Sequence, residues 1–123
     1  IELMIVIAII GILAAIAIPN FIAYRNKAFC SRAENDARSV AAALADYFAI
    51  PSNVIAPTGD PTGAPLEVKL SGEGSNANTA EVRGSADAIT IIVTDGSSRC
   101  PTDYRNTVEG WDDNGNGTFT KIM

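Results

Sequence analysis

The sequence contains no histidine, and this absence removes the commonest general base and the commonest metal ligand from any site that the chain forms. The serine and cysteine residues have no base beside them at a readable spacing, so nucleophilic catalysis lacks its usual machinery. A phosphate-binding glycine loop is missing too, because Gly72-Glu73-Gly74 follows a strand-like segment but opens no helix. We therefore predict a protein that is not an enzyme.

Positive charge is also scarce: nine lysines and arginines stand against 14 aspartates and glutamates, which gives a net charge of −5. Residues 1–50 carry four charges of each sign, so residues 51–123 hold the whole excess of acid. An acidic region without a basic cluster argues against nucleic acid as the main partner and fits a solvated outer surface. With 123 residues, the chain has room for one modest domain and a protruding helix.

The chain contains one long apolar run, which lies near its beginning. Every side chain of residues 3–18 (LMIVIAIIGILAAIAI) is apolar, and Pro19 closes the run. A helix here is apolar on all faces, unlike a helix on the surface of a soluble domain. Burying its large side chains is worth roughly 16–33 kcal/mol, more than the stability of about 5–15 kcal/mol of a typical domain. The run must therefore lie in lipid or among other helices like itself.

Two simpler interpretations of this run stay open. Ala15-Ile16-Ala17 has the form of a signal-peptide cleavage site, although Glu2 stands where a secretory signal has positive charge. A single-pass membrane anchor is the other interpretation, although 16 helical residues span about 24 Å of a hydrocarbon core of about 30 Å.

Glu2 is the one charge beside the apolar run, and it has two interpretations. As a terminal charge it reaches the headgroup region and is stabilised by the helix dipole. Alternatively, it meets a cation where helices pack without water, since an unpaired charge there is costly. The nearest such cation is the N-terminal amine of another copy of the chain.

About the first thirty residues (IELMIVIAIIGILAAIAIPNFIAYRNKA) resemble the N-terminal helix of type IV pilins and of the pseudopilins of type II secretion. The shared features are the glutamate, the apolar segment with Gly11, the proline after it and a following amphipathic helix. In that family a prepilin peptidase removes a basic leader, and the new first residue is N-methylated. A few residues, commonly Phe-Thr-Leu, precede the glutamate there, and we expect them and the leader to be missing from this chain.

This resemblance implies the major structural subunit of a type IV pilus, whose partners are copies of itself, the inner membrane and the pilus assembly machinery. The precursor is held in the inner membrane and then polymerises into an extracellular helical filament. Residues 1–19 are expected to form the transmembrane and filament-core segment, 20–50 the amphipathic helix of the head, and 51–123 its loop and sheet. A pseudopilin is the close alternative.

Gly11 and Pro19 weaken the helix at two points, since glycine has low helix propensity and proline removes a backbone donor. We expect the helix to kink or open between them, and a bent but continuous span is the alternative. In pilin filaments the corresponding segment loses helical hydrogen bonds, so the resemblance implies extension here.

Residues 20–50 have a one-sided pattern that predicts an amphipathic helix ending at Ile50-Pro51. Glu34 and Arg38 have the spacing of an ion pair worth a few tenths of a kcal/mol. The apolar positions recur at spacings of three and four: Phe29, Ala33, Ala37, Val40, Ala41, Leu44, Tyr47 and Phe48.

Residues 51–123 are predicted to form a small β-rich head. Residues 51–65 are rich in proline and should form a loop. Strand-like patterns follow at residues 66–70, 80–83, 88–94, 107–111 and 118–122. An antiparallel sheet of about four strands covered by the long N-terminal helix makes the predicted fold α+β.

Cys30 and Cys100 are either two unrelated thiols or a disulfide. A disulfide is favoured if the head lies outside the cytoplasm, and it would close a loop of about 71 residues, worth about 4 kcal/mol. Many pilins have their disulfide nearer the C-terminus.

Residues 112–117 (DDNGNG) suggest a calcium site or a hairpin. Asp112, Asn114 and Asn116 fit the first half of an EF-hand loop, but Met123 stands where the bidentate glutamate is needed. Asn-Gly between two strands is a strong hairpin signal, which we prefer. Apart from this calcium candidate, we expect no cofactor.

A last alternative is electron conduction through aromatic side chains on the N-terminal helix. Such rings at helical spacing more often serve packing, so this interpretation is weaker than the structural one. The rings are Phe21, Tyr24, Phe29, Tyr47 and Phe48.

Overall fold

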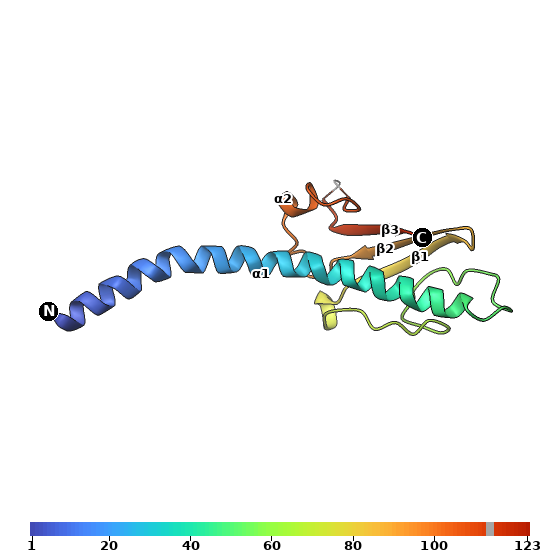
Figure 1. Cartoon of the computed structure of the whole chain (residues 1–123), viewed down its shortest axis with the longest axis horizontal. Helices are drawn as coiled ribbons and strands as arrows, with labels where there is room; N and C mark the ends of the chain where they lie inside the picture. The colour runs from blue at the N-terminus through green and yellow to red at the C-terminus, as the bar shows by residue number, and fades with distance from the viewer. Residues whose placement is uncertain (113–114) are drawn as a thin grey trace.

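The computed structural model describes residues 1–112 and 115–123, as a long helix with a small head packed against its second half (Figure 1). The N-terminus lies at the free end of the helix, and the head wraps the other end. This is the α+β architecture that the sequence predicted. The elements are α1 (Glu2–Phe48), the 3-10 turn η1 (Gly74–Asn76), β1 (Thr79–Ser85), β2 (Ala88–Thr94), α2 (Thr102–Arg105) and β3 (Thr118–Ile122).

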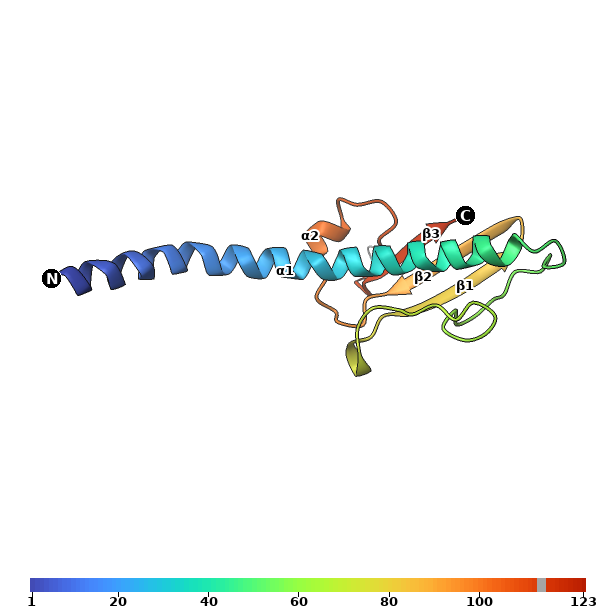
Figure 2. The ribbon, with the colours of Figure 1, turned by 60° about the horizontal axis from the view of Figure 1, so that its bottom comes forward.

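The second half of α1 is amphipathic, as its periodicity predicted. Its buried residues follow one stripe at spacings of three and four, because such positions share a helix face. They are Cys30, Ala33, Asp36, Ala37, Val40 and Leu44. Figure 2, in which the molecule is turned by 60°, shows this half of α1 crossing the sheet. The helix ends at Phe48, two residues before the predicted end at Ile50-Pro51.

The sheet has three antiparallel strands in the order β1-β2-β3. In the central strand β2, burial alternates strictly: Ile89, Ile91 and Val93 are buried, and the residues between them are partly exposed. Val82 of β1 lies opposite Ile91 and is also buried. These side chains form one core with the buried stripe of α1.

The predicted strand at residues 66–70 is wrong. Glu67 has a φ of 50°, and the amide of Val68 donates to the carbonyl of Pro61 over 2.9 Å, so the segment folds back on its own loop. Leu66, Val68 and Leu70 nevertheless pack against the core. The alternating pattern therefore predicted which side chains face the core, where they are partly buried, but not how the backbone pairs.

The predicted strand at residues 107–111 is wrong as well. The chain leaves α2 through turns, and Gly110 has a φ of 101°, which an extended strand does not accommodate. Trp111 alone forms an antiparallel bridge, with Phe119 of β3. The described sheet therefore has three strands where about four were expected.

The predicted opening of α1 between Gly11 and Pro19 is wrong for the single chain. The helix is continuous from Glu2 to Phe48 with Pro19 inside it, and it bends gently (Figure 1). Proline removes only one hydrogen bond, and the neighbouring turns keep the helix together. Extension of this segment within a filament stays a prediction.

Candidate functional site

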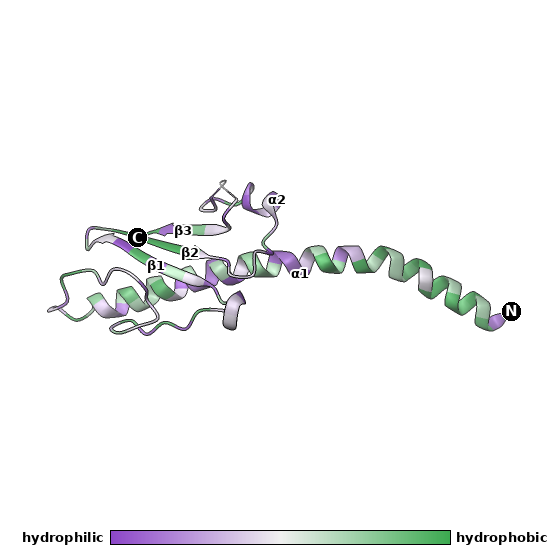
Figure 3. Ribbon diagram, turned by 180° about the vertical axis from the view of Figure 1, so that it is seen from behind, coloured by the Kyte–Doolittle hydropathy of each residue, from purple (hydrophilic) through white to green (hydrophobic). Residues whose placement is uncertain are grey.

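The first half of α1 projects from the head, and most of its ribbon is coloured as hydrophobic (Figure 3). By length and composition, α1 is the one helix of the described chain that is long and apolar enough to cross a membrane. Its eleven large apolar side chains are each 52–77% exposed: Leu3, Met4, Ile5, Val6, Ile7, Ile9, Ile10, Ile12, Leu13, Ile16 and Ile18. The described residues of the chain leave this surface uncovered.

Glu2 lies in the first turn of α1, where the helix dipole favours a negative charge. Within the described residues the ion pair is Arg83–Glu81, at 2.7 Å, so Glu2 forms none in the single chain. Any cation for Glu2 must come from outside this chain.

Gly11 lies in the middle of the projecting segment, and a β-carbon added there would meet no atom within 4 Å. Packing inside the chain therefore does not require a glycine at this position. Small residues on apolar helices let two backbones approach closely, so the side of α1 at Gly11 is suited to contact with another helix.

A disulfide joins Cys30 to Cys100, as we expected. It connects α1, at the point where the helix enters the head, to the loop that follows β2. Both cysteines are buried, and they belong to the same core as the sheet. The base of the head is thus covalently attached to the helix.

Glu34 provides a second attachment one turn further along α1. Its Oε1 accepts the Tyr104 hydroxyl and the Trp111 Nε1–H, each over 3.0 Å. Burial and the negative charge of Glu34 raise the pKa of the Tyr104 hydroxyl above its usual value of 10. The ion pair expected between Glu34 and Arg38 is replaced, because Arg38 donates to Asn35 over 3.2 Å.

Asp36 provides a third attachment, on the opposite side. Its buried carboxylate accepts the amide and the hydroxyl of Ser71, over 3.0 and 2.8 Å, and the side-chain amide of Asn78, over 2.7 Å. Asn78 in turn accepts the amide of Gly96 over 3.1 Å. Three contacts satisfy a charge that would otherwise be costly to bury.

The contacts of Glu34 and Asp36 with the head were not predicted from the sequence. One signal was available for Asp36, because it lies four residues before Val40 and eight before Leu44, on the apolar stripe of the helix. A carboxylate on a buried stripe needs donors from other parts of the chain. Sequence spacing does not reveal which donors these are.

The candidate calcium segment is only partly described, because Asp113 and Asn114 lie outside the described residues. Asp112 pairs through its amide with the Thr118 carbonyl over 2.9 Å, and Asn116 is exposed. This pairing and the Trp111–Phe119 bridge bring the two ends of the segment together, as in a hairpin. In residues 1–112 and 115–123, no group of three histidine, cysteine or acidic side chains is placed to hold a metal. Calcium binding stays a prediction.

Comparison with curated proteins finds the type IV major pilin protein PilA of Myxococcus xanthus (strain DK1622), which is 52% identical to this chain over 48 residues. The resemblance to type IV pilins is confirmed. The matched stretch covers 39% of this chain and 22% of the length of that pilin. No protein-family model matches the chain, and no solved structure matches it. The pilin resemblance therefore stands on one partial match and on the features of α1.

Proposed function

We propose that this chain is the major structural subunit of a type IV pilus. The precursor is held in the inner membrane by residues 1–19 and is then polymerised into a helical surface filament, with the heads outward and the apolar segments forming the core. The observation that carries this proposal is the helix of uncovered apolar side chains projecting from a folded head. Lipid covers this surface before assembly, and sister helices cover it afterwards.

The change of surroundings costs little free energy. Both lipid and sister helices are apolar, so the projecting side chains exchange one nonpolar environment for another. In water the same side chains would expose far more apolar surface than an ordinary monomer tolerates. In this proposal the segment therefore passes from lipid into the filament and is never exposed to water as an isolated helix.

Glu2 supplies the register of the assembly in this proposal. It forms no ion pair in the single chain, and it lies at the end of an apolar surface where an unpaired charge is costly. The N-terminal amine of a neighbouring copy would neutralise it. Apolar helices can slide along one another at little cost, and this ion pair would fix one axial position of each helix relative to its neighbour.

The test is substitution of Glu2 by alanine in a bacterial host that has pilus assembly machinery. We expect Glu2→Ala protein in the membrane fraction but no fibres in electron micrographs of sheared surface material. Glu73→Ala, which removes an exposed acidic residue from the head, is the matched control and should give normal fibres. Normal fibres from Glu2→Ala would contradict the pairing role.

The proposed role is structural and involves no catalysis. The related pilin is named as a major pilin, and this supports a filament subunit over an enzyme. The pseudopilin alternative predicts a dependence on calcium through residues 112–116. Removal of calcium by a chelator, followed by thermal unfolding, distinguishes the two.

A further inference from the structure

Positive side chains gather where α1 leaves the head. Arg25, Lys27 and Arg32 are exposed on the helix, and Arg99 joins them from the loop after β2. We name these four residues the cationic neck. Between Glu2 and Glu34 the helix contains no acidic residue, although the whole chain has a net charge of −5. The neck is thus a local reversal of the charge of the protein.

The ring of Phe29 brings the two parts of the neck together. The guanidinium carbon of Arg32 lies 4.9 Å from the centre of this ring, and that of Arg99 lies 5.4 Å from it. Phe29 and Arg99 each immediately precede a cysteine of the disulfide, so the covalent link places them side by side. A guanidinium held against a ring keeps its N–H groups available at its edges.

Carboxylates do not neutralise the cationic neck. In the part of the chain that the structure describes, the ion pair joins Arg83 to Glu81, away from the neck. Glu34 is the first acidic residue after Glu2, and Tyr104 and Trp111 already occupy its carboxylate. The neck therefore presents unneutralised cations to whatever surrounds it.

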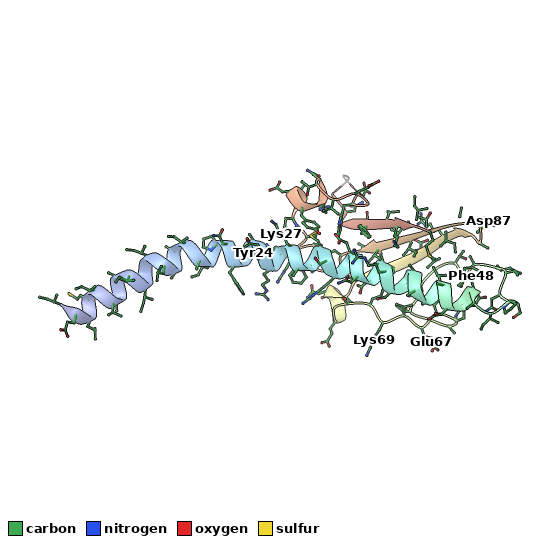
Figure 4. The ribbon with its side chains drawn as sticks, in the orientation of Figure 1. Tyr24, Lys27, Phe48, Glu67, Lys69 and Asp87 are labelled. Carbon is green, nitrogen blue, oxygen red and sulfur yellow. A yellow bond between two sulfur atoms is a disulfide. The ribbon has the colours of Figure 1, made fainter. Side chains whose placement is uncertain are left out.

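The position of the neck along α1 indicates what surrounds it. Arg25 lies seven residues after Ile18, or about 10 Å along a helix, whereas a headgroup layer is about 5–8 Å thick, and a long basic side chain extends back over this difference. Phe21 and Tyr24, between the apolar run and the neck, are 68% and 72% exposed, and tyrosine is typical of membrane interfaces. The Nζ of Lys27 lies 5.8 Å from the centre of the Tyr24 ring, and Figure 4 shows both side chains on one side of α1.

We propose that the cationic neck binds the phosphate groups of anionic phospholipids while the subunit is in the membrane. This inference rests on the membrane stage of the proposed function. With the apolar run in the hydrocarbon, Arg25 and Lys27 reach the lipid phosphates. Arg32 lies 14 residues after Ile18, or about 21 Å along a helix, so Arg32 and Arg99 stand above this layer and add only a longer-range, salt-screened attraction to it. Guanidinium groups suit phosphate because their N–H donors match its oxygens. The acidic remainder of the head is repelled by an anionic surface, so the neck also orients the head outward.

The test uses the full-length protein reconstituted into vesicles of equal parts phosphatidylcholine and phosphatidylglycerol. After extraction into a mild detergent, the lipids that remain bound are counted by native mass spectrometry. We expect phosphatidylglycerol to predominate. In Arg25→Gln/Lys27→Gln the preference should fall, by roughly five-fold for each cation removed. Lys69→Gln/Lys121→Gln removes two cations from the head and should keep the wild-type preference.

Three results would overturn the inference. The first is equal retention of both lipids by the wild-type protein. The second is an equal loss of preference in the Lys69/Lys121 control, which would show an effect of overall charge alone. The third is displacement of the lipid by inorganic phosphate more strongly than by chloride at the same ionic strength, which would indicate a site for free phosphate.

The same experiment separates this inference from the proposed function. Protein that does not float with the vesicles would contradict the membrane stage, and the neck proposal with it. Protein that inserts but has no lipid preference contradicts the neck proposal alone. Protein that prefers phosphatidylglycerol but gives no fibres in sheared material contradicts the filament and leaves the neck in place.

Discussion

The indole Nε1–H of Trp111 donates a 3.0 Å hydrogen bond to Glu34, a carboxylate 77 residues earlier in the chain. The same oxygen accepts the hydroxyl of Tyr104. One side chain of α1 therefore holds both α2, through Tyr104, and the residue that bridges to β3, Trp111. Together with the disulfide at Cys30, it attaches the C-terminal part of the head to the helix.

Replacement of Glu34 by alanine should destabilise the head. Two donors lose their acceptor in a partly buried site, and we expect a loss of about 2 kcal/mol in the free energy of unfolding. Urea unfolding of the full chain in detergent, followed by Trp111 fluorescence, measures this loss. Glu109→Ala, which removes an exposed acidic residue two positions before Trp111, is the control. Equal midpoints for the two variants would contradict the role assigned to Glu34.

Loss of the disulfide should lower the free energy of unfolding more than replacement of Glu34 does. The link between Cys30 and Cys100 spans 70 positions, and the chain-entropy treatment assigns about 4 kcal/mol to a loop of this length. We expect the double variant Cys30→Ser/Cys100→Ser to unfold at a much lower urea concentration than the wild type. A reducing agent should lower the wild-type midpoint to that of the variant and leave the variant unchanged. A wild-type midpoint that resists full reduction would contradict this prediction.

The stability of the head should fall at alkaline pH because of Tyr104. Its pKa is raised above 10 in the folded protein, by burial first and by Glu34 second, so the unfolded chain releases this proton at a lower pH than the folded chain does. The stabilisation is therefore complete below pH 10 and is lost as the pH rises through the folded pKa. Thermal unfolding between pH 8 and 11 measures the decline.

Tyr104→Phe should make this pH dependence less steep, since the variant has no proton to release at that position. Tyr24→Phe is the control, because Tyr24 is exposed on the projecting helix. A wild-type profile as flat as that of Tyr104→Phe would show that Tyr104 does not contribute to the alkaline loss.

The features predicted correctly from the sequence depend on local periodicity. Three- and four-residue spacing identified the buried stripe of α1, and a run rich in isoleucine, valine and threonine identified β2, in which Ile89, Ile91 and Val93 are buried. These patterns are local because neighbouring side chains alternate between core and solvent in a regular element. The apolar run was equally clear, since its composition alone excludes a solvated helix.

The errors arise where distant residues decide the structure. The alternation at residues 66–70 reported the burial of Leu66, Val68 and Leu70, but a strand also needs a free partner edge, and this segment bonds back to Pro61 instead. The anchoring role of Asp36 depends on Ser71 and Asn78, which lie 35 and 42 residues further along. No short window of sequence contains both partners of such contacts.

The sequence also predicted a weak point between Gly11 and Pro19, where the single chain remains helical. A proline in a helix interior costs about 3 kcal/mol, so opening this segment is easier than opening its neighbours. In a filament, the free energy of packing between subunits also determines whether this segment stays helical or opens. The continuous helix of the single chain and an extended segment in the filament are therefore compatible states of one sequence.

Pro19→Ala tests whether assembly uses this weak point. Alanine restores the amide donor to the carbonyl of Ala15 and makes opening of the helix harder, by about 3 kcal/mol. We expect electron cryomicroscopy of wild-type filaments to show an extended segment between Gly11 and Pro19, and Pro19→Ala to give either a continuous helix or fewer fibres. Asn20→Ala, at the next position of the same helix, should behave as the wild type. A continuous helix in the wild-type filament would show that Pro19 only bends α1, because the weak point would then be present in the chain but unused in the assembly.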